Sequence, residues 1–456
     1  MNFLQYIVDL GPSVMLPLVI MIIGLCLRQG FGKSLMSGLT IGVGFVGIGL
    51  VIGLLTNNLG PAASDMAKHF GVGLNVIDLG WPGTSPMAWA SSMGLIAIPI
   101  AIVVNVLMLV TKMTKVVNVD IWNIWHMAFT GIIVQIATGN VWVGMAAVAI
   151  HAAIAYKLGD IFGSVTDNYF GLDGVAIPHG SSATMGVMAS PIDDLIELIP
   201  GVRKINLTTE KLEQRFGVFG QPLIVGTILG LAIGLLAGYQ VGAALQLGVQ
   251  MGAVMLLMPM VVKLIMQGLL PIAAAAQKML QKHFKSGDYK VGLDPALLLG
   301  DTQVVAAGLM FVPLTILIAF IVPGNKVLPF GDLATIGFFV AMAVGVHKGN
   351  LFRTLISGSV IMYITIWIAN QMVVLQTSLA ERVNLLGKAD QVGSLDQGGN
   401  PLTFLMAKGF TWDVSIGFFV IFLLYIGSFV YTYLKYKRGT LYRVALPVTQ
   451  KAASRR

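Results

Sequence analysis

Long apolar runs recur along this sequence, and they constrain its fold more than any other feature. A helix needs about 20 residues to cross about 30 Å of hydrocarbon. Runs of this kind lie near residues 10–27, 34–56, 92–111, 125–157, 219–238, 241–270, 303–323, 333–347, 354–375 and 414–434. The run 125–157 is long enough for two crossings hinged at Gly139-Asn140, and 240–272 for two that break at Pro259 or Lys263. About eleven crossings are expected.

The composition agrees with a chain whose solvent is lipid. Of 456 residues, 56% are hydrophobic and only 11% are charged, and this excludes a water-soluble core for the whole chain. The single cysteine, Cys26, lies in an apolar run, so a disulfide framework or a cysteine metal site within the chain is excluded. We predict an all-α polytopic membrane protein, with residues 1–438 as one membrane-embedded unit and 439–456 as a basic cytoplasmic tail.

Lysine and arginine flank the apolar runs unevenly, and such positive flanks stay on the cytoplasmic side of a membrane. The connection with Arg28 and Lys33 has no acid and the stretch Lys278–Lys290 is basic, so both are expected inside. The segments Asn57–Val72 and Thr377–Asn400 are mixed in charge and are expected outside. The carboxyl terminus is expected in the cytoplasm because of its basic residues, and an odd number of crossings then places the amino terminus outside.

Three semi-polar segments rich in glycine, proline and hydroxyl groups are too short to span a membrane and too apolar for free loops. They are Asp78–Ser92, Leu172–Met185 and Gly292–Thr302. Such pieces are re-entrant hairpins or broken helices in transporters, where they line a cavity. In the first segment we expect the prolines and glycine to prevent a regular helix: Pro82, Gly83 and Pro86. The first and third segments lie in corresponding parts of the two halves, which hints at an internal repeat.

Ionisable residues inside the apolar regions need a physical reason, because each costs a few kcal/mol in lipid. His126 follows Trp122 by four positions, so the two rings share one helical face suited to a polyhydroxylated solute; an interfacial aromatic belt is the alternative. His179 lies in a Pro-His-Gly turn and either lines a site or stabilises the hairpin. Asp294 before Pro295 either caps a helix or accepts hydrogen bonds from a solute.

Three further features are expected to be structural. Asp332 is interpreted as the N-cap of a helix that begins at Leu333, and His347 as a structural group or a partner contact at a cytoplasmic helix end. In the stretch Pro191–Ile199, aliphatic residues and three acids would lie on opposite faces of a helix. This pattern predicts a short amphipathic helix at the membrane surface. The sequence has neither a Walker A motif nor an HExxH motif, so no bound cofactor or metal is expected.

Longer stretches carry a family resemblance. They begin at Gly44 (GFVGIGLVIGL), Gly80 (GWPGTSPMAWAS), Val116 (VVNVDIWNIWHM), Ile177 (IPHGSSATMG), Gly292 (GLDPALLLGDT) and Leu328 (LPFGDLATIGFFVAMAVGVHKGNLFRTLISG). Over nearly its whole length the chain resembles the galactitol permease (enzyme IIC) family of bacterial phosphoenolpyruvate-dependent sugar phosphotransferase systems, which is grouped with the ascorbate permeases. The resemblance implies eleven transmembrane helices in two inverted repeats, a core domain with two re-entrant hairpins, and a dimerisation domain that forms a homodimer.

The resemblance also implies a substrate-binding site. In the ascorbate permease, residues matching His126, His179 and Asp294 contact the solute, and glutamines stand where this chain has Gly180, Ser181 and Ser182. A loop matching Thr84–Trp89 lines the same pocket. With Asp301 at the end of the third segment, the candidate substrate-binding residues are His126, His179, Asp294, Gly180, Ser181, Ser85, Pro86, Met87, Trp89 and Asp301.

The function implied is that of a permease subunit of the bacterial inner membrane. It translocates galactitol or a closely related polyol by an elevator-like movement and presents it for phosphorylation by a phosphocysteine on a separate IIB partner, which IIA supplies. Cys26 lies in the first helix and cannot be that group, so the chain has no phosphorylated catalytic residue of its own, and whether it counts as an enzyme is left open. One alternative is an ion-coupled secondary transporter that uses Asp78, Asp294 and Asp301. Another is a membrane sensor or scaffold without transport.

Overall fold

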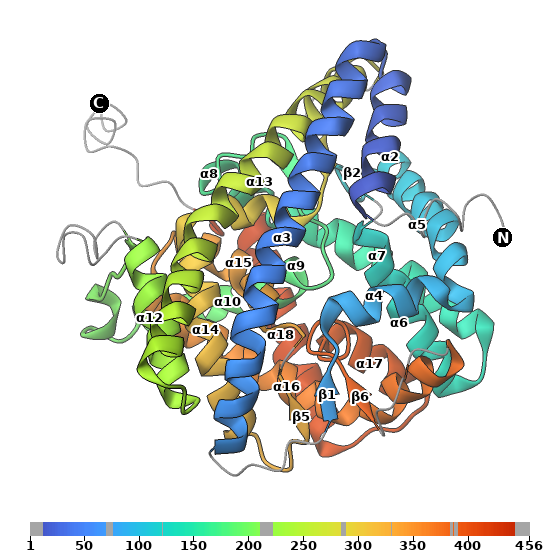
Figure 1. Cartoon of the computed structure of the whole chain (residues 1–456). Helices are drawn as coiled ribbons and strands as arrows, with labels where there is room; N and C mark the ends of the chain where they lie inside the picture. The colour runs from blue at the N-terminus through green and yellow to red at the C-terminus, as the bar shows by residue number, and fades with distance from the viewer. Residues whose placement is uncertain are drawn as a thin grey trace, which may run out of the picture.

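Helices make up most of the computed structural model of this chain (Figure 1). It describes residues 12–69, 76–120, 122–209, 222–283, 289–329, 331–383, 386 and 391–442. Most of the basic stretch between α13 and β4, and the tail beyond residue 442, therefore lie outside the described residues.

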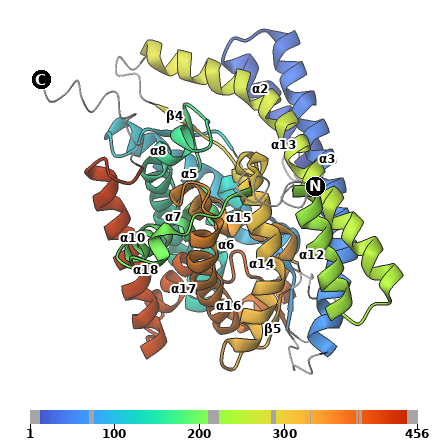
Figure 2. The same cartoon turned by 90° about the vertical axis from the view of Figure 1, so that its left-hand side faces the viewer.

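Four helices form a group that we call the arm. They are α2 (Pro12–Cys26), α3 (Phe31–His69), α12 (Pro222–Leu236) and α13 (Val241–His283), which pack chiefly against one another and lie along one side of the molecule in Figures 1 and 2. The helix α13 runs without interruption for 43 residues, so the break expected at Pro259 or Lys263 is wrong. Backbone groups freed by a break have no water to bond in lipid, and a long helix can instead tilt.

The remaining helices form what we call the body. They are α5 (Ser92–Val110), α6 (Trp122–Thr138), α7 (Val141–Ile161), α14 (Thr302–Ile321), α15 (Ile336–Val346), α16 (Leu351–Arg382), α17 (Pro401–Phe410) and α18 (Ile416–Lys437), with the shorter elements given below. The hinge expected at Gly139-Asn140 is confirmed. Gly139 has a φ of +67°, and the Asn140 side chain caps α7 by accepting a hydrogen bond from the Trp142 amide.

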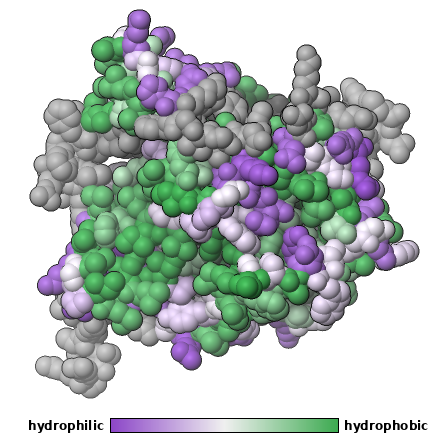
Figure 3. Space-filling view, turned by 90° about the horizontal axis from the view of Figure 1, so that it is seen from below, coloured by the Kyte–Doolittle hydropathy of each residue, from purple (hydrophilic) through white to green (hydrophobic). Residues whose placement is uncertain are grey.

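Apolar side chains cover much of the outside of the body. Among the described helices, α5, α7, α14, α16 and α18 are long and apolar enough to cross a membrane. On α18, Phe418, Ile421 and Tyr425 are buried, while Ile416 and Leu423 are 86% and 69% exposed. Figure 3 shows a broad hydrophobic area of this kind on the face seen from below. Exposed apolar faces of this extent are typical of contact with lipid.

Two small parallel sheets connect distant parts of the chain. In the first, β1 (Val76–Asp78) lies between β5 (Val327–Leu328) and β6 (Val392–Gly393), with Ile77 paired to Leu328 and to Val392. In the second, β4 (Lys290–Gly292) lies between β2 (Val116–Asn118) and β3 (Val175–Ala176). Each half of the chain thus gives the central strand of one sheet and the outer strands of the other. Since all strands run parallel, the segments that follow them leave from the same edge.

The segments expected to be irregular begin at these edges, and the first of them differs from expectation. Residues 80–90 form a regular helix, α4 (Gly80–Ala90), which ends at Ser91 just before α5. Pro82 lies in the first turn of α4, where amides have no partner within the helix, so it does not disrupt the start of the helix.

The other two segments contain short helical pieces. After β3 a turn leads into α9 (Ser182–Gly186), and after β4 the 3-10 helix η3 (Pro295–Gly300) precedes α14. Asp294 caps η3 by accepting from the Ala296 amide at 2.8 Å. The capping role of Asp294 is confirmed.

The predicted surface helix is α10 (Ala189–Glu197). Its acids face the body: Asp193 contacts Arg353 at 2.8 Å and His347 at 2.9 Å. Leu195 and Leu198 are instead 60% and 75% exposed. The structural role expected for His347 is confirmed, because its second ring nitrogen bonds Ser357 at 2.8 Å.

Candidate functional site

Buried carboxylates lie at the edges of both sheets and accept hydrogen bonds from backbone amides there. At the first sheet they belong to Asp78 and Asp332. Asp78 accepts hydrogen bonds from the amides of Gly80, Asp332 and Leu395 at 2.9–3.1 Å. Asp332 accepts from the amides of Trp81 and Asp396 at 2.8 and 2.7 Å. Asp332 lies at the N-cap position of η4 (Leu333–Thr335), which begins at Leu333 as expected, but no amide of η4 bonds its carboxylate, so the expected side-chain cap is absent. Its carboxylate instead binds amides from two other segments.

Asp120 does the corresponding work at the second sheet. Its carboxylate accepts from the amide of Trp122 at the start of α6 at 2.9 Å and from the amide of Asp294 at 3.0 Å. These bonds fix the start of α6 against the start of η3. The two helices therefore present His126 and Asp294 from one rigid edge.

The turn after β3 brings His179 against His126. The two rings meet edge to face with centroids 4.1 Å apart, and Trp125 lies against His126 at 4.0 Å. The Nδ1 atom of His179 accepts from the amides of Ser181 and Ser182 at 3.2 and 3.4 Å. Since Nδ1 is an acceptor, the proton of the neutral ring is assigned to Nε2.

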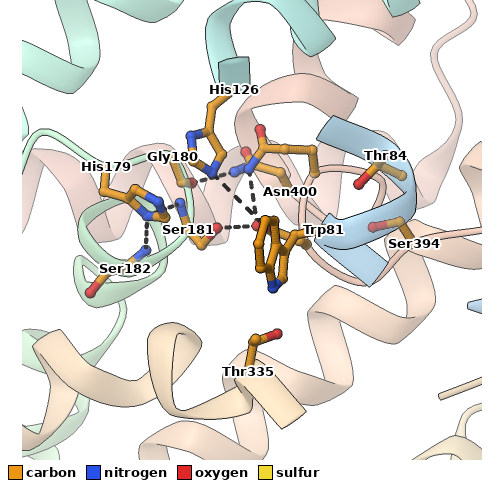
Figure 4. A network of polar contacts seen from close by, with 12 residues as sticks. Trp81, Thr84, His126, His179, Gly180, Ser181, Ser182, Thr335, Ser394 and Asn400 are labelled. Atoms are coloured by element: carbon orange, nitrogen blue, oxygen red, sulfur yellow. Dashed lines mark hydrogen bonds and ion pairs between the residues drawn. The ribbon is translucent and has the colours of Figure 1, made fainter. Parts of the chain in front are cut away.

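Gly180 is required by the closeness of this turn to α6. A Cβ atom built on Gly180 would lie 2.7 Å from Cβ of His126, which is shorter than any relaxed carbon contact. The Gly180 carbonyl also accepts from the Asn400 side chain at 2.5 Å. Glycine therefore lets the turn lie directly on the histidine (Figure 4).

Four titratable side chains form a row through the site. Nε2 of His179 lies 3.8 Å from Oδ2 of Asp294, and Nε2 of His126 lies 3.8 Å from Oδ2 of Asp396. Both distances exceed a hydrogen bond. The row Asp294, His179, His126 and Asp396 thus has a histidine pair at its centre and a carboxylate at each end.

The segment 394–400, which no sequence motif singled out, is part of this site. Ser394, Gln397 and Asn400 are fully buried and Asp396 is 6% exposed. Gln397 donates to the Asp396 carboxylate at 3.2 Å, and the Ser181 hydroxyl also donates to it. Gly398, Gly399 and Pro401 resemble the glycine and proline pattern of the other hairpins, and this pattern was a usable signal.

Several buried polar atoms near this row have no hydrogen-bond partner in the described part of the chain. They are Nδ1 and Nε2 of His126, Nε1 of Trp81 and Trp122, Oγ of Ser182 and Oε1 of Gln397. A buried polar group without a partner costs about 1–3 kcal/mol. Such a concentration of donors and acceptors, bordered by aromatic rings, fits a ligand that carries many hydroxyl groups on an apolar C–H frame.

The other predicted site residues lie in different surroundings. Ser85 and Met87 are each 3% exposed on α4, whose residues Trp81 and Thr84 point toward the same centre in Figure 4. For Pro86 and Trp89 the structure describes only the backbone, within α4.

Asp301 is engaged at the far end of η3. Its carboxylate caps α14 through the amides of Gln303 and Val304 at 2.9 and 3.0 Å, and it accepts from the Tyr169 hydroxyl at 3.2 Å. These contacts support a structural part for Asp301, and they do not bring it to the histidine pair. Searched over the described residues, the chain has no group of three or more His, Cys, Asp or Glu suited to a metal ion.

Comparison with known proteins identifies the family. Residues 6–432 match the model of EIIC-GAT, described as the PTS system sugar-specific permease component. The chain is 57% identical over 430 residues to the PTS system galactitol-specific EIIC component of Escherichia coli (strain K12), covering 94% of this chain and 95% of that protein. It is 37% identical over 410 residues to a putative permease IIC component of the same strain, covering 89% and 94%. The chain therefore belongs to the EIIC-GAT family of PTS sugar-specific permease components.

Proposed function

We propose that this chain translocates galactitol, or a closely related polyol, and presents it for phosphorylation by a partner protein. The chain belongs to a family of multi-pass permeases of the bacterial inner membrane, and its 57% identical relative is named galactitol-specific. The observation that carries the proposal is the row Asp294, His179, His126 and Asp396. It places buried carboxylates and imidazoles, with unused hydrogen-bonding atoms, inside an otherwise apolar protein.

The phosphoryl group comes from a phosphocysteine on IIB, which IIA recharges. Cys26 lies at the last residue of α2 and is exposed, far along the chain from every residue of the row, so the donor is a separate protein. We propose that IIB docks on a cytoplasmic face that includes the basic segment 278–290 and the carboxyl-terminal tail. This orientation, with the amino terminus outside, follows from the distribution of lysine and arginine.

An inverted repeat with eleven crossings is part of the proposal. Four helices of the second half begin 210 residues after their counterparts, at 222 for 12, 241 for 31, 302 for 92 and 351 for 141. The exchange of central and outer strands between the two sheets has the same twofold character. The proposed crossings are five helices in the first half and five in the second, with α18 as the eleventh. They are α2, α3, α5, α6 and α7, then α12, α13, α14, α15 and α16. Repeats of this kind place the solute where the two halves meet.

An elevator-like movement of the body against the arm completes the transport model. The support is that α2, α3, α12 and α13 pack chiefly with one another, while the row lies wholly on elements outside the arm. On α3 a stripe of residues is more than half exposed, namely Leu39, Val43, Val46 and Leu50. We propose that this stripe belongs to a homodimer interface, which would hold the arms still while the bodies move.

The decisive experiment follows labelled galactitol into proteoliposomes that contain the full-length chain. The proposal expects galactitol phosphate to accumulate only when phosphorylated IIB is present on the cytoplasmic side. Accumulation of unmodified galactitol driven by a proton or sodium gradient would replace it with the ion-coupled alternative. Absence of any flux, with or without IIB, would favour a sensor or scaffold. Liposomes without protein and IIB with its cysteine replaced are the controls.

A further inference from the structure

Asp396 is the one member of the row that neither the sequence motifs nor the family resemblance pointed to. We propose that Asp396 is a substrate-binding residue that sets specificity by charge: its buried carboxylate makes the site accept an uncharged polyol and reject the phosphorylated product. This inference rests on the proposed function.

Asp396 is built into the site from three sides. Its amide is held by the Asp332 carboxylate at 2.7 Å, which fixes the backbone. Its own carboxylate accepts from Ser181 of the hairpin and from Gln397 at 3.2 Å. Its Oδ2 atom lies 3.8 Å from Nε2 of His126, which has no hydrogen-bond partner among the residues that the structure describes. A solute hydroxyl beside this pair can accept from imidazole and donate to carboxylate at once.

Among the described residues, no lysine or arginine forms an ion pair with the carboxylates of the row. The ion pairs of Asp294 and Asp396 in the described part of the chain are with histidines only. Where the structure describes ion pairs of lysine and arginine, the partners are other acids, namely Asp160, Asp167, Asp193, Asp194, Glu197 and Asp413.

This arrangement distinguishes the polyol from its phosphate ester. A polyol offers hydroxyl donors, which buried carboxylates can accept. The phosphate group of the monoester carries a charge of about −1.5 to −2 near neutral pH and offers chiefly acceptors. Its charge is repelled by the carboxylates, and water screens this repulsion poorly in a buried site. Phosphorylation therefore converts a ligand that the row binds into one that the row repels. Release of the phosphorylated product is then favoured over its rebinding.

The test measures binding to the purified full-length protein in lipid nanodiscs, with labelled galactitol displaced by unlabelled galactitol or by galactitol phosphate. The wild type should prefer the free polyol by about 100-fold or more. In Asp396→Asn, which keeps the shape and removes the charge, galactitol should bind more weakly, and the preference for the free polyol should narrow by about tenfold. Asp413→Asn is the matched control, since this carboxylate is 64% exposed and paired with Lys408; its preference should not change.

Two further measurements test the proposal if Asp396→Asn does not fold. Asp396→Glu retains the charge and should therefore retain the rejection of galactitol phosphate. With the wild type, the dimethyl triester of galactitol phosphate is larger but uncharged, and it should compete better than the monoester.

The possible results separate this inference from the proposed function. If the wild type binds no galactitol, the proposed function fails. If it binds galactitol but Asp396→Asn keeps the full preference for the free polyol, the inference alone fails. It fails equally if Asp396→Glu admits the monoester, or if neither the triester nor the monoester competes, because size would then explain the exclusion.

Discussion

His126 combines full burial with two ring nitrogens that lack hydrogen-bond partners within the described ranges of the chain. Desolvation without a partner lowers stability by about 1–3 kcal/mol, and a residue of this kind is retained for its chemistry. In the structure its ring packs on Trp125 and His179, contacts that a phenyl ring can also make. A substitution that keeps these ring contacts should therefore preserve stability while it impairs function.

We predict that His126→Phe keeps or raises the melting temperature of the purified protein while it reduces galactitol uptake by about 100-fold or more, the effect of leaving bound hydroxyl groups unpaired. Thr315→Val is the matched control, because the Thr315 hydroxyl, within α14, is likewise buried and has no partner in the part of the chain that is described. That variant should keep normal uptake. Normal uptake by His126→Phe would remove His126 from the site.

Part of this site could be predicted from the sequence, and the rest could not, for a physical reason. His126, His179 and Asp294 stood out because an ionisable group in an apolar run is costly. Asp396 stood in a polar segment, where a carboxylate needs no explanation. Only the fold reveals that the segment is buried, since the amides of Leu395 and Asp396 bond carboxylates more than 60 positions away.

At the scale of elements, α10 is held to the body by its acids. Burial tends to raise the pKa of Asp193, but hydrogen bonds and charge from His347 and Arg353 outweigh it and hold the pKa below the ordinary 3.8. A carboxyl group whose pKa is lower in the folded state contributes stability that is complete above the ordinary pKa and is lost as the pH falls through the lowered value.

We predict that Asp193→Asn lowers the free energy of unfolding by about 2 kcal/mol at pH 7, and that the difference from the wild type shrinks below about pH 3.8. Thermal melting in detergent between pH 3 and pH 7 measures both effects. Glu197→Gln on the same helix is the control: Glu197 pairs with Arg353 but is 52% exposed, so its loss should matter little. A pH-independent difference for Asp193→Asn would contradict the electrostatic explanation.

Element boundaries were predictable where local chemistry decides them and not elsewhere. Gly139-Asn140 combines a positive φ with a capping side chain, so the hinge between α6 and α7 could be located. Pro82 misled because it lies in the first turn of α4, where proline is tolerated, whereas Pro86 lies in the interior of α4 and yet does not end the helix. For α13, the sequence could not show that neighbouring helices support one uninterrupted helix.

For the whole molecule, the transport model depends on the boundary between the arm and the body. An apolar cavity of about 630 Å³ lies on this boundary, lined by Met66 and Leu236 of the arm and by residues of α14 that include Leu317. A second cavity of about 550 Å³ lies within the body, between α14, α16 and α18, and is lined by Val360 and Leu424 among others. The two cavities allow a matched comparison.

In a Cys26→Ser background, cysteines at Leu236 and Leu317 should be joined by a short thiol-reactive cross-linker, because both side chains are about half exposed and line the same cavity. A body that slides past the arm cannot do so when tied to it, so we predict that cross-linking abolishes uptake. The same treatment of cysteines at Val360 and Leu424, also about half exposed but both within the body, should leave uptake unchanged. Each single-cysteine variant, treated alike, controls for modification itself. Full uptake by the cross-linked arm-to-body pair would mean that the solute crosses without relative movement at this boundary, and the elevator model would then have to be abandoned for a gate within the body.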